Sequence, residues 1–209
     1  MHPDAPSLAA LIGSRICHDL INPIGAISNG LELVAMGTPD PAGPEMSLIQ
    51  QSCDNATARI RFFRIAFGSA GDTRDMPAAE AEKTLIDHYT GTRIVPRWQA
   101  SQPLARNLVQ LGFLQVLCLE AAVPQGGIIS VTVAENALIA TATGDTVVID
   151  DALWARLDNK PPASPEPLRP AHVQFALLAQ LCADAGIAPV LTREDQTARL
   201  SLALPTLGA

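Results

Sequence analysis

Basic residues are scarce in this chain of 209 residues, and their scarcity argues against two classes of partner. Fourteen Lys and Arg stand against 21 Asp and Glu, which gives a net charge of −7. Binding to nucleic-acid phosphates needs clustered Lys and Arg, which this composition does not favour. Acidic membrane surfaces would repel the same negative charge. We therefore expect neither nucleic acid nor a membrane as a partner.

Signals for export and membrane insertion are also missing. The segment Met1 to Asp4 has no positive charges followed by an apolar stretch, as a signal peptide would have. Charged or polar residues interrupt every apolar run well before the ~20 residues that a membrane span needs. The four cysteines are far apart and form no CxxC pair, which favours reduced thiols. These features predict a cytoplasmic protein.

Apolar residues, by contrast, are plentiful at 48% and follow a helical period at the start of the chain. Their spacing of three and four predicts one helix from Leu8 to Val34 and a second from Glu45 to Phe67. A hairpin of two helices buries only one face of each helix. An exposed apolar seam would favour a homodimer in which two hairpins form a four-helix bundle. We assign residues 1–72 to this hairpin domain.

The remaining residues, 73–209, alternate between helical and extended patterns. Helices are predicted at 80–89, 104–123 and 173–185. Strands rich in β-branched residues are predicted at 93–98, 128–133, 137–143, 146–148, 190–192 and 198–204. Five prolines mark 158–170 as a loop. The expected fold is therefore α+β: a helical hairpin followed by a sandwich of helices and sheet.

One short segment of the first helix carries the candidate chemistry. It reads Cys-His-Asp-Leu-Ile-Asn-Pro from Cys17 to Pro23. At about 100° per residue, His18 falls on the side opposite the apolar stripe and faces solvent. A neutral imidazole is a good nucleophile near pH 7. The neighbouring Asp19 can hold the proton of the other ring nitrogen and fix the tautomer. The scattered His2, His88 and His172 give no ligand spacing for a metal site.

The segment from His18 to Pro23 resembles the H-box of histidine kinases, in which an acidic residue follows the phospho-accepting histidine. The longer stretch from His18 to Glu32 resembles the ChpT-type histidine phosphotransferases, bacterial phosphorelay proteins best known from cell-cycle control in alphaproteobacteria. The sharp motif covers only residues 15–32. The resemblance implies a dimeric four-helix bundle and a kinase-like C-terminal domain that does not use ATP.

The C-terminal half departs from a working kinase in three places. Leu114 to Val131 resembles the N-box helix and the strand after it, but the asparagines that hold magnesium and phosphates are missing. Thr141 to Asp145 stands where an Asp-x-Gly-x-Gly box is expected. Pro161 to Pro170 contains no glycine, so little backbone is available to approach a triphosphate. We interpret 73–209 as a degenerate kinase-like (Bergerat-type) domain with no cofactor or metal site.

The resemblance also assigns roles to individual residues. His18 takes a phosphoryl group from one receiver aspartate and passes it to another, Asp19 orients and polarises the imidazole, and Asn22 positions the phosphoryl group. The docking surface would consist of Arg15, Gly25, Asn29 and Glu32. The expected partners are receiver domains of a hybrid histidine kinase and of response regulators, and Mg²⁺ would be bound by the receiver. Two alternatives stay open: an ATP-dependent kinase with diverged boxes, and a non-catalytic dimer that sequesters receivers.

Overall fold

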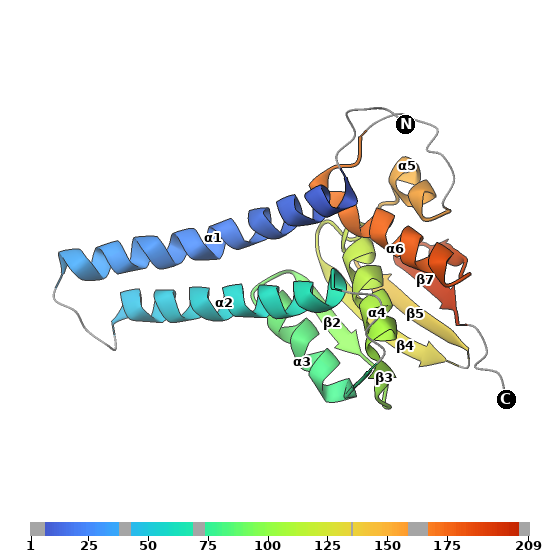
Figure 1. The fold of residues 1–209 in the computed structure, drawn as a ribbon, viewed down its shortest axis with the longest axis horizontal. Helices are drawn as coiled ribbons and strands as arrows, with labels where there is room; N and C mark the ends of the chain where they lie inside the picture. The colour runs from blue at the N-terminus through green and yellow to red at the C-terminus, as the bar shows by residue number, and fades with distance from the viewer. Residues whose placement is uncertain (1–6, 38–42, 69–73, 135, 159–166, 205–209) are drawn as a thin grey trace.

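A helical hairpin projects from a layer of helices and sheet (Figure 1). The computed structural model describes residues 7–37, 43–68, 74–134, 136–158 and 167–204. The helices are α1 (Leu8–Met36), α2 (Pro44–Ala66), α3 (Ala78–Tyr89), α4 (Arg106–Glu120), α5 (Asp151–Trp154) and α6 (Val173–Asp184), with 3₁₀ turns η1 (Ala155–Asp158) and η2 (Pro170–His172). The strands are β1 (Asp75–Met76), β2 (Ile94–Trp98), β3 (Leu104–Ala105), β4 (Gly127–Ala134), β5 (Ala137–Thr143), β6 (Pro189–Glu194) and β7 (Thr197–Ala203).

The hairpin begins with a capped helix, and its two helices approach each other closely at one glycine. The Ser7 hydroxyl accepts a 3.2 Å hydrogen bond from the amide of Ala10, which satisfies an orphan donor of the first turn of α1. Further along, α1 and α2 pack closely where Gly30 meets Ile49. A Cβ atom built on Gly30 would lie 2.5 Å from the Cγ1 atom of Ile49. The loop expected at 37–44 lies largely outside the described residues.

The apolar stripe of α1 is only partly buried. Of its residues Leu11 is buried, whereas Ile24 and Leu31 are each 54% exposed. The helix therefore packs one edge of the stripe on α2 and leaves the other edge uncovered.

The main sheet has five strands in the order β2-β4-β5-β7-β6. Strands β2 and β4 are parallel, and the other neighbours are antiparallel. Alternate side chains of the central strands are fully buried beneath the helices, among them Val131, Ala140 and Leu200. Helix α4 lies on this face and packs against β4, β5 and β7, and α6 packs against α4 (Figure 1). The predicted α+β class is correct.

The base of the hairpin belongs to the same core as the sheet. Phe62, Phe63 and Ala66 at the end of α2 are buried in one cluster with residues of α3, α4 and the strands. The boundary expected between residues 72 and 73 falls in 69–73, outside the described residues. Gln110 of α4 donates to the backbone carbonyls of Ala66 and Gly68, at 3.2 and 2.9 Å. These contacts fix where the hairpin leaves the α/β layer.

Two sequence predictions differ from the structure in the α/β layer. The strand expected at 146–148 is wrong, because the amide of Val148 donates to the carbonyl of Ala122 in the turn after α4 and pairs with no strand. The helix expected at 104–123 is shorter at both ends. Leu104 and Ala105 pair with β1, and the residues after Glu120 form turns. Most of the loop expected at 158–170 lies outside the described residues.

Candidate functional site

The side chain of His18 projects from α1 into solvent. Its side chain is 79% exposed, whereas that of the neighbouring Asp19 is 13% exposed. The Nδ1 atom of His18 lies 3.1 Å from Oδ1 of Asp19. Because a carboxylate only accepts, Nδ1 is the donor in this contact, and in the neutral imidazole the lone pair is then on Nε2. The Nδ1 side of the ring is thus oriented by Asp19, and the Nε2 side faces solvent.

Arg15 lies one turn before His18 and is turned inward. Its Nε donates to Oδ2 of Asp19 at 2.7 Å, and its Nη1 donates to the backbone carbonyl of Ala171 at 2.6 Å. The Arg15 side chain is 18% exposed. The structure therefore places this guanidinium between α1 and η2.

The other residues assigned to the site from the sequence stay accessible on α1. Asn22, Asn29 and Glu32 are exposed. Gly25 is half-buried, yet a Cβ atom built there would find nothing within 4 Å. Their spacing of three and four residues keeps them near one face of the helix. This geometry leaves room for a second molecule beside His18, and their individual roles stay predictions.

A buried polar pair that the sequence analysis did not assign to the site lies on α3 and α4. The hydroxyl of Tyr89 donates to Oε2 of Glu120 at 3.0 Å. Burial raises the pKa of Glu120 above its usual value. Burial first, and then Glu120, raise the pKa of Tyr89 well above 10. A carboxyl at the end of an otherwise apolar helix was the sequence signal for this pair.

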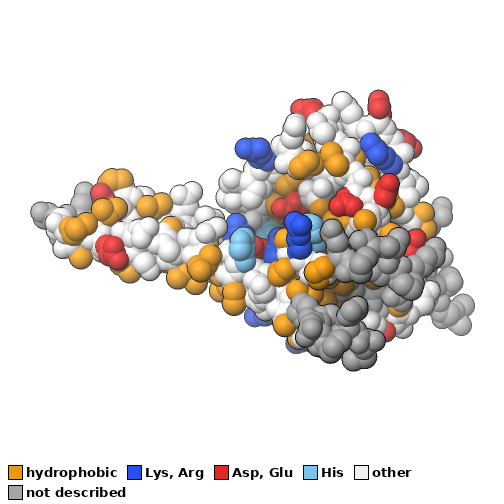
Figure 2. Space-filling model, turned by 90° about the horizontal axis from the view of Figure 1, so that it is seen from above, with side chains coloured by type: hydrophobic (Ala, Val, Ile, Leu, Met, Phe, Trp, Pro, Cys, Tyr) orange, Lys and Arg blue, Asp and Glu red, His pale blue; other side chains and the backbone are white. Residues whose placement is uncertain are grey.

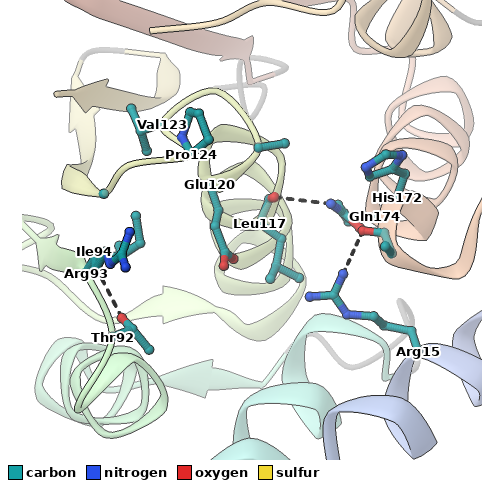
Figure 3. A pocket seen from close by; sticks show the side chains of 13 residues that line it. Arg15, Thr92, Arg93, Ile94, Leu117, Glu120, Val123, Pro124, His172 and Gln174 are labelled. Atoms are coloured by element: carbon teal, nitrogen blue, oxygen red, sulfur yellow. Dashed lines mark hydrogen bonds between the residues drawn. The ribbon is translucent and has the colours of Figure 1, made fainter. Parts of the chain in front are cut away.

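A pocket of about 430 Å³ lies between the start of α1, the end of α4 and the start of α6 (Figure 3). Arg15, Arg93, Glu120, His172 and Gln174 supply its polar lining. Gln174 is buried and donates to the carbonyl of Leu117 at 3.2 Å. Burial, followed by the charge of Arg169, lowers the pKa of His172. The pocket occupies the place where α4 and α6 face each other, and it carries a carboxyl alongside its cationic groups.

The hairpin also presents apolar side chains to solvent. Ile24 and Leu31 on α1 and Ile60 on α2 are 53–54% exposed. Figure 2 shows hydrophobic side chains along the projecting hairpin. Exposed apolar groups gathered on one element are typical of a surface that contacts another protein.

Over residues 7–37, 43–68, 74–134, 136–158 and 167–204, no group of three or more His, Cys, Asp and Glu is placed to hold a metal ion. In that same part of the chain, no helix combines the length and apolarity of a membrane span.

Comparison with known proteins gives matches that agree with one another. The family described as the histidine phosphotransferase C-terminal domain matches residues 78–197. Protein phosphotransferase ChpT of Brucella abortus (strain 2308) is 39% identical over 129 residues. That alignment covers 61% of this chain and 61% of the relative, so it spans about three fifths of the relative's length.

A solved structure extends the similarity over nearly the whole fold. A bacterial phosphotransferase superposes with a TM-score of 0.77 at 30% identity, covering 96% of this chain and 98% of that chain. The matched family region spans α3 to the first residue of β7, which is more than half of the chain. The chain therefore belongs to the histidine phosphotransferase family.

Proposed function

We propose that this protein is a histidine phosphotransferase of a two-component phosphorelay, with His18 as the phosphoryl carrier. The observation that carries the proposal is the geometry of His18: an exposed imidazole whose Nδ1 is held by Asp19 at 3.1 Å, with Nε2 free. Phosphoryl transfer depends mainly on positioning and charge neutralisation, so few residues on this side are needed.

The reaction follows from that geometry. The Nε2 lone pair of His18 attacks the phosphorus of a receiver aspartyl phosphate. A P–N bond forms as the P–O bond to the receiver carboxylate breaks, and the carboxylate leaves with the bonding electrons. Attack by a second receiver aspartate reverses these steps. Asp19 stabilises the positive imidazole that develops, because its carboxylate already accepts from Nδ1.

Receiver domains of a hybrid histidine kinase and of response regulators are the partners proposed for this reaction. Asn22 is exposed one turn from His18 and would position the phosphoryl group by donating to its oxygens. Gly25, Asn29 and Glu32 would line the docking surface beyond it. The chain itself would bind no cofactor, and Mg²⁺ would be held by the receiver. The acidic composition and the well-separated cysteines favour a cytoplasmic setting.

A homodimer completes the proposal. The uncovered apolar side chains of α1 and α2 would pack against the same side chains of a second copy, as a four-helix bundle. Such a self-complementary contact is the commonest form of dimer interface.

A transfer assay tests the function directly. The full chain is mixed with a receiver domain that carries labelled phosphate and with Mg²⁺, without ATP. We expect acid-labile, base-stable label on this chain, and none on His18→Ala. The variant keeps His2, His88 and His172, so loss of label assigns the site to His18. Circular dichroism checks that the variant is folded.

The other results of this assay identify the alternatives. Label from ATP alone, with none from any receiver, would make the protein a kinase. Tight receiver binding without label from either source would leave a sequestering dimer. Label retained by His18→Ala would refute the assignment of the carrier.

A further inference from the structure

Arg15 joins two parts of the chain that are 156 residues apart in sequence. Its guanidinium reaches from α1 to Asp19 on the same helix and to the carbonyl of Ala171 in η2. The two bonds, at 2.7 and 2.6 Å, use different nitrogens of one rigid planar group. In Figure 3 the Arg15 side chain extends from α1 toward the start of α6.

Both oxygens of Asp19 are engaged. Oδ2 accepts from Arg15 and Oδ1 accepts from Nδ1 of His18. A carboxylate is planar, so holding one oxygen restricts where the other can lie. The orientation of the imidazole is thereby coupled to the guanidinium of Arg15.

The carbonyl of Ala171, which accepts from Arg15, is itself held in place. Ala171 lies within η2, where the amide of His172 donates to the carbonyl of Arg169 at 2.9 Å. Val173 and Gln174 follow directly and are buried, and Gln174 is hydrogen-bonded to α4. The α/β layer therefore offers Arg15 an anchor tied to the core.

We infer that Arg15 is a positioning residue for His18: its guanidinium is anchored by the carbonyl of Ala171 and holds Asp19 in place, so that the imidazole keeps its proton on Nδ1. The α/β layer thus contributes to the reactivity of His18 through the guanidinium of Arg15. The consequence for phosphate transfer rests on the proposed function, whereas the effect on the imidazole proton does not.

The position of the imidazole proton of His18 can be measured without any receiver domain. Nitrogen-15 NMR of the full chain near pH 8 distinguishes the two neutral tautomers of His18. We expect Nδ1–H in the unmodified protein and a marked gain of Nε2–H in Arg15→Gln. Arg15→Lys keeps the charge but lacks the planar fork that makes both bonds at once, so we expect a tautomer ratio between the two. Arg61→Gln, an exposed arginine on α2, is the matched control and should leave the ratio unchanged.

Transfer kinetics separate positioning from docking. With Arg15→Gln we expect the rate at saturating receiver to fall roughly 10- to 100-fold, with KM changed less than about threefold. If Arg15 were instead a docking residue, KM would rise and the tautomer ratio would stay as in the unmodified protein. That result overturns the inference.

The two proposals fail in different ways. A tautomer shift in Arg15→Gln, with no label on the unmodified chain in any transfer assay, would sustain the inference and reject the phosphotransferase. Label on His18, with an unchanged tautomer ratio in both Arg15 variants, would support the phosphotransferase and reject the inference about Arg15. Should Arg15→Gln not fold, the ratio in Arg15→Lys decides: a ratio equal to that of the unmodified protein rejects the inference.

Discussion

The imidazole of His88 lies flat on the ring of Phe62, with centroids 3.8 Å apart and planes inclined by 12°. His88 is buried, and its Nδ1 finds no hydrogen-bond partner among the residues that the structure describes. Burial, and then the charge of Arg59, lower the pKa of His88 from 6.5 to about 3. The ring is therefore packed as a neutral aromatic group at the base of the hairpin.

This packing predicts a stability that declines in mild acid. The unfolded chain takes up a proton on His88 below about pH 6.5, whereas the folded protein resists it down to about pH 3. The contribution is complete above pH 6.5 and is lost as the pH falls toward 3. Between pH 8 and pH 5.5 we expect about 1 kcal/mol less unfolding free energy.

Chemical denaturation at the two pH values measures this loss. Lower pH is avoided because the sequence pI is near 5.0 and association would interfere. His88→Phe keeps the stacked ring and removes the titrating group, so its unfolding free energy should fall by about 1 kcal/mol less over the same interval. An equal fall in both proteins would contradict the prediction.

Gly30 and Gly13 lie on the same helix and predict opposite effects of alanine. At Gly30 the new methyl group would lie 2.5 Å from Ile49, so Gly30→Ala should destabilise by about 1–3 kcal/mol, partly offset by helix propensity. At Gly13 nothing lies within 4 Å, and Gly13→Ala should stabilise by about 0.5–1 kcal/mol. Thermal melting of both variants checks the difference in sign. Stabilisation by Gly30→Ala would mean that Ile49 gives way.

The uncovered edge of the hairpin predicts which substitution would break the proposed dimer. Ile24→Glu places a charge among apolar side chains that would face a second copy, so sedimentation should report a monomer. Val190→Glu is the matched control, because Val190 on β6 is equally exposed at 54% but lies outside the hairpin. Dimers that survive Ile24→Glu and dissociate with Val190→Glu would move the interface to the sheet edge.

Asp19→Asn tests the role of the carboxylate in transfer. The amide is nearly the same size, but it is neutral and cannot accept from Arg15 and His18 with both of its polar atoms. We expect the transfer rate at saturating receiver to fall about 10- to 100-fold, measured by rapid quench. Asp54→Asn removes the same charge from α2, where Asp54 accepts from Gln50, and should transfer normally. A full rate for Asp19→Asn would show that His18 needs no carboxylate partner.

Local patterns in the sequence predicted the helix that carries His18. The three-four spacing of α1 placed His18 outward because helical geometry depends only on neighbouring residues. The same reasoning failed at 146–148. Its β-branched residues fit a strand pattern, but Val147 is buried and the Val148 amide is used by the turn after α4. Side-chain type alone does not say which backbone partner a segment will find.

Contacts between residues far apart in the sequence could not be predicted from local patterns. The bond from Arg15 to Ala171 spans 156 residues, and that from Tyr89 to Glu120 spans 31. Arg15 was therefore predicted at a docking surface, whereas its guanidinium lies between α1 and η2. Short helix α5 was also missed, although Asp150 accepts from the amides of Ala152 and Leu153 in the manner of a helix cap.

Phe62 and Phe63 give the hairpin and the sheet a common hydrophobic core. A destabilising substitution in either part therefore lowers the stability of both. A substitution that creates a cavity anywhere in that core lowers the fraction of folded molecules, because a small domain unfolds cooperatively. Substitutions deep in the sheet would therefore weaken the proposed phosphoryl transfer through His18 by reducing the number of folded molecules, while each folded molecule would keep its activity.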